Sequence, residues 1–375
     1  MNRVFVAALL SLVCHPAMAA NQELIPLTAF ADGIKHWQDR HGKDYARYAP
    51  DQVAEIADNI LLYQRDNGAW IENRDPARIL DANEKAALIA EKSEARGSFD
   101  NRNIYSQVEY LAAAFGRTGK IAYRDAAARG LRYLLAQQID GCGGWPHTVP
   151  GTTTYHGYIT IADEVTSGLL RLLRKVSAGA VPFEYLDSQA RASAKAALDR
   201  GDECVLKLQV VQNGTLTGWA GQYDPHSLRP AQGRAFELPS IVSQETVEML
   251  RYLMSIERPS AAQIQAVEGA VEWLRRSQIK GMRLEKVMLE KPVQYTYHVA
   301  TFDYRLVDDA SAPPLWARFY DLEDNSVVLA NRDSVRVKQF SEIHPERRSG
   351  YGWFGTWPAE LLEKEYPAWR ARHLR

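Results

Sequence analysis

Gln64-Arg-Asp-Asn-Gly-Ala-Trp70 is a stretch that returns further along the chain as Gln138-Ile-Asp-Gly-Cys-Gly-Gly-Trp145 and as Gln212-Asn-Gly-Thr-Leu-Thr-Gly-Trp219. The three tryptophans lie 75 and 74 residues apart, and a period of this length accommodates two helices with their two connections. Glycine allows the backbone to leave a helix in the left-handed conformation, and each tryptophan is expected to fill the gap between neighbouring units. The repeat therefore predicts a closed ring of helix pairs, with the Gly-Trp turns gathered at the end that carries the function.

The first twenty residues have the features of an export signal. A short basic start precedes the apolar run Val4–Val13 and the small-residue cleavage site Pro16–Ala19. The apolar run is too short to span a bilayer as a helix. We therefore expect residues 1–20 to be a signal peptide and the mature chain to be periplasmic or extracellular, with no membrane anchor.

Composition excludes some classes of function for the mature chain. The net charge of −1 becomes about −2 once Arg3 is removed, which argues against a nucleic-acid-binding protein. Two cysteines remain, Cys142 and Cys204, and the sequence leaves open whether they form a disulfide in an oxidising compartment. Nothing in the sequence indicates the oligomeric state.

Helical periodicity dominates the chain up to about residue 280. Apolar residues at helical spacing predict helices over 51–62, 104–115, 123–137, 163–176, 188–209, 243–254 and 261–278. After residue 281 the pattern changes, because 293–303 alternates as a strand does, and 317–323 with 326–329 predicts a short β-element. A last helix from Ala359 is expected to pack across the ring. We predict one domain, residues 21–375, that is dominated by α-helices and has short β-elements in its C-terminal third.

Carboxylates stand at the starts of two predicted helices. Asp100 and Asn101 precede the helix at 104, and Asp163 and Glu164 begin the next pair. A single carboxylate in such a place can be only an N-cap, and this interpretation stays open for Asp100. Two adjacent carboxylates instead indicate a bound cation or a substrate amine. Asp100, Asp163 and Glu164 together would give an oxygen-rich site for Ca²⁺, which takes carboxylates from separate loops.

Arginines are prominent in the segments without helical periodicity. The long segment 218–237 includes Arg234, and the C-terminal part adds Arg318 and Arg332. The planar guanidinium group binds a carboxylate through two hydrogen bonds, although any one of these arginines also fits a solvated surface charge. The chain lacks the motifs of serine hydrolases, zinc proteases and phosphate-binding loops.

Several motifs, taken in order, resemble the pectate lyases of polysaccharide lyase family 10. They are Gly143–Pro146, Tyr158–Glu164, Gln222–Pro225, Arg234–Glu237, Arg318–Tyr320, Asn331–Asp333 and Arg347–Trp353. The resemblance implies an irregular (α/α) toroid with a cleft at one end, and Ca²⁺-dependent β-elimination on polygalacturonate, an anionic polysaccharide.

The resemblance also implies roles for individual residues. Arg234 would be the Brønsted base, Asp100 and Asp163 would be the carboxylates on the Ca²⁺ side, and Arg318 and Arg332 would bind substrate carboxylates. We further expect Asn101 and Trp145 to contact the substrate. The pKa of arginine is above ~12 in water, so a base role requires surroundings that favour the neutral guanidine.

Two departures from the family pattern leave other functions open. Glu72 stands where the family has a lysine, and Ala162 stands where it has an amide. The chain is therefore also compatible with a lyase or glycoside hydrolase acting on another uronan, with Asp100 and Asp163 as the two carboxylates of the hydrolase. A non-catalytic uronan-binding protein is a further alternative. The terpenoid cyclases that share Gln/Trp repeats need an Asp-rich motif and an apolar cavity, which are not evident.

Overall fold

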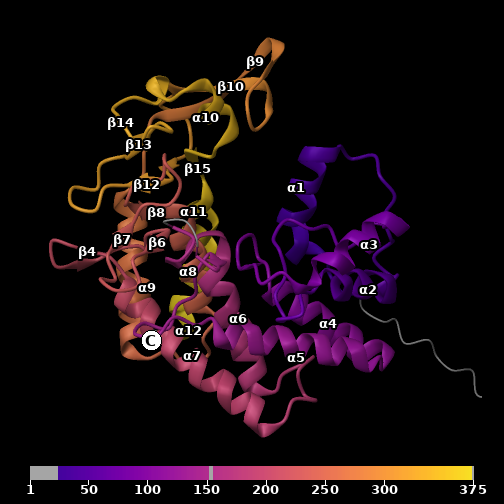
Figure 1. Cartoon of the computed structure of the whole chain (residues 1–375). Coiled ribbons are helices and arrows are strands. Elements are labelled where there is room, and N and C mark those ends of the chain that lie inside the picture. The colour runs from indigo at the N-terminus through magenta and orange to yellow at the C-terminus, as the bar shows by residue number, and fades with distance from the viewer. Residues whose placement is uncertain (1–23, 152–154, 374–375) are drawn as a thin grey trace, which may run out of the picture.

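The computed structural model describes residues 24–151 and 155–373 (Figure 1). The predicted signal peptide, residues 1–20, lies outside the described residues. The α-helices are α1 Ala31–His41, α2 Val53–Tyr63, α3 Ala82–Ala90, α4 Tyr105–Thr118, α5 Ile121–Ala136, α6 Val165–Ala178, α7 Ser188–Leu208, α8 Ser243–Met254, α9 Ala261–Arg276, α10 Pro345–Gly350, α11 Trp357–Glu360 and α12 Tyr366–His373. Within the described ranges, no helix combines the length and the hydropathy that crossing a membrane requires.

The strands are mostly two residues long and connect the helices. They are β1 Gly97–Ser98, β2 Thr148–Val149, β3 Ile159–Thr160, β4 Val211–Gln212, β5 Thr215–Leu216, β6 Gln222–Tyr223, β7 Pro230–Ala231, β8 Ile241–Val242, β9 Met282–Gln294, β10 Val299–Asp308, β11 Trp316–Ala317, β12 Phe319–Tyr320, β13 Leu329–Ala330, β14 Arg336–Val337 and β15 Phe354–Gly355.

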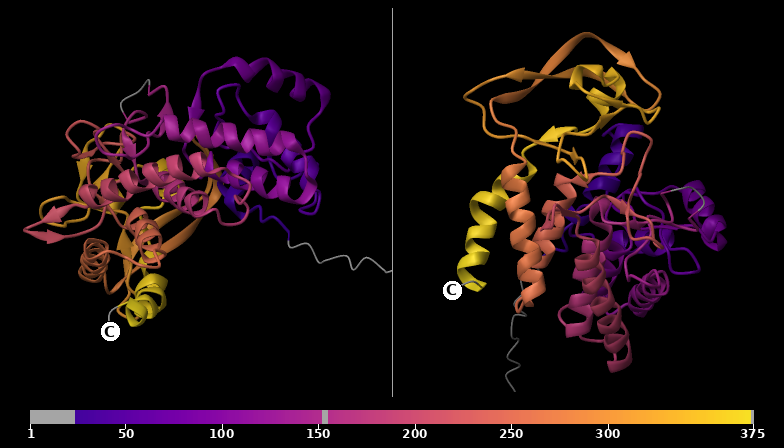
Figure 2. Two further views of the ribbon diagram at one scale, coloured as in Figure 1. Left: turned by 90° about the horizontal axis from the view of Figure 1, so that it is seen from below. Right: turned by 90° about the vertical axis from the view of Figure 1, so that its left-hand side faces the viewer.

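Three helix pairs, α4–α5, α6–α7 and α8–α9, follow one another around an arc (Figures 1 and 2). The first helices of the pairs contact one another in succession, as do the second helices. The first helix of each pair is the more deeply buried one, so the first helices form the inner layer and the second helices the outer layer. The predicted dominance of α-helices is confirmed, and the predicted helices match the observed ones within a few residues. The three pairs form an arc, as expected for part of the predicted ring of helix pairs.

A buried tryptophan closes each turn between an outer helix and the next unit. The indole Nε1 donates a hydrogen bond to a carbonyl near the end of the preceding outer helix. The four bonds are Trp70 to Ile60 (2.8 Å), Trp145 to Leu134 (2.8 Å), Trp219 to Val205 (2.8 Å) and Trp316 to Leu274 (2.7 Å). The fourth turn is not visible as a repeat in the sequence, because the β9–β10 hairpin is inserted between the end of α9 and Trp316.

A glutamine clamps each of the first three turns to the next outer helix. Gln64, Gln138 and Gln209 each donate from Nε2 to one carbonyl of their own turn and to one carbonyl of that helix. The second of these bonds runs to Ala126 (2.9 Å), Ala197 (2.8 Å) and Ala266 (2.9 Å), respectively. The predicted assignment of Gln212 to this position is wrong, because the β4–β5 hairpin lengthens the third turn. Gln212 donates instead to the carbonyl of Asp321.

The predicted β-elements of the C-terminal third are present as β9–β15, and further short strands lie earlier in the chain. Strands β1, β3 and β8 each precede an inner helix and pair with strands β2, β6 and β12, respectively. The segment 293–303 is not one strand, because it contains the turn of the β9–β10 hairpin. The C-terminal helices pack against α8 and α9, where Arg251 bonds Glu365 at 2.7 Å and the Arg275 guanidinium lies 5.3 Å from the Tyr366 ring.

Cys142 and Cys204 form a disulfide, with their Cα atoms 5.0 Å apart. Cys142 lies in the second Gly-Trp turn and Cys204 on α7, so the bond joins the same two segments that Gln138 clamps. The question that the sequence left open is answered by this pairing.

We predict that Gly143→Ala destabilises the protein far more than Gly141→Ala. Both glycines have positive φ, +108° and +86°, and an alanine at either position is strained. Only at Gly143 would the new Cβ also meet a backbone carbon, that of Arg200 at 2.7 Å. Urea unfolding should show a loss of about 2–5 kcal/mol for Gly143→Ala and of about 1–2 kcal/mol for Gly141→Ala. Equal losses would contradict the proposed close contact between the turn and α7.

Candidate active site

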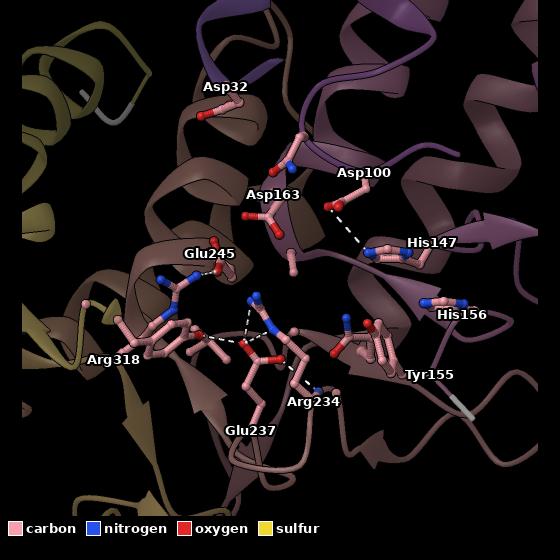
Figure 3. A pocket seen from close by; sticks show the side chains of 18 of the residues that line it. Asp32, Asp100, His147, Tyr155, His156, Asp163, Arg234, Glu237, Glu245 and Arg318 are labelled. Carbon is pink, nitrogen blue, oxygen red and sulfur yellow. Dashed lines mark hydrogen bonds and ion pairs between the residues drawn. The ribbon is translucent and has the colours of Figure 1, made fainter. Parts of the chain in front are cut away.

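A cavity of about 730 Å³ lies at the end of the helix pairs where the Gly-Trp turns gather (Figure 3). Its walls come from segments that are far apart in the sequence: the turns near 72 and 100, the segments 155–163 and 221–245, and the C-terminal segments at 318–319 and 350–352. This position agrees with the expectation that the turns carry the functional site.

Three carboxylates reach the cavity from equivalent places in successive units. Asp100 follows β1, Asp163 follows β3, and Glu245 lies in the first turn of α8 directly after β8. Asp163 has a φ of +53°, in the left-handed region that non-glycine residues rarely adopt. Glu245 is not among the residues predicted from the sequence, although its place at the start of an inner helix is a signal that points to it.

The side chains of Asp100 and Asp163 differ in their protonation state. The Nε2 atom of His147 lies 3.4 Å from Oδ1 of Asp100. Burial disfavours the charged form of Asp100, but His147 and Arg234 outweigh it and lower the pKa of Asp100. Burial and then repulsion from Asp100 and Glu245 raise the pKa of Asp163 to about 7. Asp100 is thus ionised at neutral pH, whereas Asp163 is still partly protonated.

Two arginines face these carboxylates across the cavity (Figure 3). Arg234 donates to Glu237 Oε1 from Nε at 2.9 Å, and its Nη2 lies 2.7 Å from the same oxygen. Tyr351 also donates to this oxygen, at 2.6 Å. Arg318 donates from Nη2 to Glu245 at 2.6 Å. The pairing with carboxylates fixes both guanidinium groups at the cavity wall.

The surroundings of Arg234 favour the protonated, positively charged form of its side chain. Burial lowers the pKa of this guanidinium, but Glu237 and Tyr351 outweigh burial and hold the pKa well above its ordinary value. The Arg234 guanidinium lies 5.4 Å from the centre of the Tyr351 ring, and the Arg318 guanidinium lies 4.8 Å from it. Tyr351 and Glu237 are not among the predicted site residues, although both lie in motifs that resemble the family.

The structure brings five of the predicted site residues to the cavity: Asp100, Asn101, Asp163, Arg234 and Arg318. Asn101 donates to Asn73 Oδ1 at 2.9 Å.

The other three predicted site residues do not line the cavity. Trp145 is fully buried and donates to a helix carbonyl, so its assignment to substrate binding is wrong: it has no surface to offer. Glu164 forms ion pairs with Arg102, at 2.7 Å, and with Arg171. These two arginines balance its charge, and it does not line the cavity as Asp163 does. Arg332 forms two hydrogen bonds with Glu346, both 3.1 Å long, outside the cavity lining.

A metal ion would find an incomplete set of protein ligands here. Within residues 24–151 and 155–373, no three or more His, Cys, Asp or Glu side chains are grouped closely enough to hold a metal by themselves. Asp100 and Asp163 nevertheless repel each other in one cavity. Among the described residues, the buried Oδ1 atom of Asp100 has only the His147 ring beside it, at 3.4 Å and without hydrogen-bond geometry. Such a pair of hard oxygen ligands fits a divalent cation that takes its other ligands from water and substrate.

Two solved structures are similar to this chain in fold. A mutant of a family 10 polysaccharide lyase from Cellvibrio cellulosa, in complex with trigalacturonic acid, has 24% sequence identity and a TM-score of 0.69, over 92% of this chain and 99% of that chain. Another structure of a family 10 polysaccharide lyase from Cellvibrio cellulosa has 25% identity and a TM-score of 0.68, over 92% of this chain and 98% of that chain. A search of curated protein sequences found no significant match.

The family itself is shown by the sequence. A family model described as pectic acid lyase matches residues 64–362, most of the chain. The protein belongs to the pectic acid lyase family, and it is a polysaccharide lyase.

We predict that Asp163→Asn changes the pH dependence of stability when a chelator is present. In the folded wild type the carboxyl keeps its proton up to about pH 7, whereas in the unfolded chain it ionises near its ordinary value of 3.8. The folded state binds more protons in this window, so the contribution of Asp163 to stability falls as pH rises. From pH 4 to pH 8 the variant should gain stability relative to wild type, by at most ~4 kcal/mol. A difference between the two proteins that stays constant with pH, measured by urea unfolding, would rule out this electrostatic account.

Proposed function

We propose that this protein is a Ca²⁺-dependent pectate lyase, which cleaves polygalacturonate by β-elimination. The observation that carries the proposal is the arrangement of Arg234 and Arg318 opposite Asp100 and Asp163 in one cavity. A uronate carboxylate between these groups can accept hydrogen bonds from guanidinium and share a cation with the aspartates. The trigalacturonic acid bound to the related lyase supports a galacturonate chain as the substrate.

The reaction requires a base and a way to stabilise negative charge. In β-elimination the C5 proton leaves, a C4=C5 double bond forms, the C4–O bond breaks and the leaving oxygen gains a proton. The negative charge that develops spreads onto the uronate carboxylate. We assign the binding of this carboxylate to Arg318, because its pairing with Glu245 fixes it at the cavity wall.

We assign the removal of the C5 proton to Arg234. Its Nε and Nη2 atoms contact Glu237, whereas its Nη1 makes no hydrogen bond to the described residues and can contact the substrate. The high pKa of Arg234 means that its neutral form has to arise in the substrate complex, where nearby cations favour it. Asp100 and Asp163 would hold Ca²⁺, and the ion, when bound, supplies a Lewis acid that makes the C5 proton more acidic.

A glycoside hydrolase is the second candidate, and one observation favours it. Asp163, with a pKa of about 7, and the ionised Asp100 form the acid and carboxylate pair that such enzymes use. Incubation with polygalacturonate separates the two functions. A lyase releases unsaturated products whose double bond absorbs ultraviolet light, whereas a hydrolase releases saturated products. A non-catalytic binding protein would release neither.

We also propose that the protein is exported. The signal-like residues 1–20 and the Cys142–Cys204 disulfide support this, because disulfides persist in oxidising compartments. Recovery of a mature protein that starts after Ala19 or Ala20 from the periplasm or the medium would bear this out. A full-length chain in the cytoplasm would contradict it.

We predict that Arg234→Lys lowers kcat by at least about a thousandfold and leaves KM within about threefold. Lysine keeps the positive charge but moves the nitrogen and loses the second contact with Glu237. Initial rates of ultraviolet absorbance increase on polygalacturonate provide the measurement. A variant with near-normal kcat would show that Arg234 is not the base, and a variant affected only in KM would assign it to carboxylate binding.

We predict that exhaustive chelation with EGTA lowers activity by at least about a hundredfold and that added Ca²⁺ restores it. Asp100→Ala should not regain activity at the Ca²⁺ concentration that restores wild type. Asp39→Ala is the matched control, because Asp39 is exposed and pairs only with Lys35 among the described residues, and it should behave as wild type. Full activity after chelation would refute the Ca²⁺ assignment. Asp100 is not the helix cap that the sequence left open, because the N-cap of α4 is Ile104 and no side chain caps this helix. An Asp100→Ala variant that keeps wild-type activity would contradict the assignment of Asp100 to the ion.

A further inference from the structure

A second cavity, of about 250 Å³, adjoins the active-site cavity between α1 and the turn at residues 71–74. The two cavities share the four lining residues His36, Glu72, Asn73 and Arg96. Trp37, Arg40, His41, Ile71 and Arg74 complete the smaller one. A ligand that fills the active-site cavity can therefore continue into this space.

Helix α1 is held firmly against the rest of the site. A Cβ on Gly33 would lie 2.7 Å from the carbonyl oxygen of Arg74, so only glycine permits this close approach. Asp32 pairs with Arg102 at 3.3 Å, and His36 lies 3.4 Å from the amide nitrogen of Asn101. The helix precedes residues 64–362, the part that the family model matches. Its residues Asp32, Lys35 and His36 border the active-site cavity on one side.

Two buried polar atoms in the lining of the smaller cavity have no hydrogen bond to the described residues. They are Trp37 Nε1, which is a donor, and Glu72 Oε2, which is an acceptor. The Trp37 ring is fixed, because the Arg78 guanidinium lies 3.6 Å from its centre and the His41 ring stacks on it at 3.9 Å. Buried donors and acceptors usually have partners, so this unmatched pair indicates a ligand. A sugar hydroxyl both donates and accepts, and it can satisfy such a pair.

The charge of the smaller cavity favours an anionic sugar. Its lining includes Arg40, Arg74 and Arg96 but only one carboxylate, that of Glu72. Arg96 is paired with Glu72 at 2.8 Å and remains 45% exposed. Arg74 lies 3.8 Å from Glu91, whereas Arg40 is exposed and makes no ion pair with the described residues. An arginine fork in such a place binds a carboxylate through two hydrogen bonds.

We propose that this smaller cavity is a distal subsite for a uronate residue of the same polysaccharide chain that occupies the active site. Arg40 and Arg96 bind its carboxylate, and Trp37 Nε1 and Glu72 Oε2 bond its hydroxyl groups. The inference rests on the proposed function, because it takes the substrate to be an oligomeric uronate. It implies that long substrates bind better than short ones that do not reach α1.

The test compares Arg40→Glu and Trp37→Phe with wild type on a ladder of oligogalacturonates from the trimer upward. Neither Arg40 nor Trp37 lines the active-site cavity, and phenylalanine keeps an aromatic ring beside Arg78. KM for the long members should rise about ten- to hundredfold in Arg40→Glu, and less in Trp37→Phe, while the trimer is cleaved as by wild type. Arg258→Glu, an exposed change of the same charge remote from both cavities, is the control and should match wild type throughout.

The outcomes separate the subsite from the proposed function. Equal effects of Arg40→Glu on all lengths, or no effect on any, would overturn the subsite while leaving the lyase assignment in place. If wild type cleaves no oligogalacturonate, the proposed function fails, and calorimetric binding decides the inference. Affinity that rises with length in wild type but not in Arg40→Glu supports the subsite, and affinity that is independent of length in wild type contradicts it.

Discussion

The hydrogen bond from a buried indole N–H to the last turn of an outer helix is the interaction on which this structure depends. It recurs at Trp70, Trp145, Trp219 and Trp316, and in the first three turns a glutamine adds a clamp to the next outer helix. Each of the first three turns is thereby fixed to two helices. Because all these turns lie at one end of the helix pairs, the short strands and helix starts that follow them are brought together there, and the side chains at those helix starts meet in one cavity.

The cost of this arrangement is electrostatic. Equivalent positions in successive units place Asp100, Asp163 and Glu245 close together, and burial strengthens their repulsion. Arg318 offsets part of it through Glu245, but Asp163 remains poorly compensated, as its raised pKa indicates. Perturbed carboxylates of this kind, with guanidinium groups opposite, are typical of functional sites rather than of sites selected for stability. A bound cation would offset the repulsion between the carboxylates, and an anionic substrate would pair with the guanidinium groups.

Most of the helical architecture could be predicted from the sequence, because apolar periodicity and the Gly-Trp spacing are local signals. The fourth turn could not, since the β9–β10 hairpin separates Trp316 from its helix. At the site, Asp100, Asp163, Arg234 and Arg318 were identified through motifs, whereas the contacts of Glu245, Glu237 and Tyr351 depend on segments that meet only in the folded chain. Trp145 was misassigned because a tryptophan in a turn motif can equally well belong to the core.

A crystal structure of Arg234→Lys with an oligogalacturonate and Ca²⁺ tests the central claim most directly, since it locates substrate and cation at once. The account predicts a uronate carboxylate within hydrogen-bond distance of Arg318 and a cation bound by Asp100 and Asp163, with the C5 atom of that sugar facing residue 234. A sugar chain bound outside this cavity, or bound within it with the carboxylate directed away from Arg318 and no cation beside the aspartates, would contradict the account.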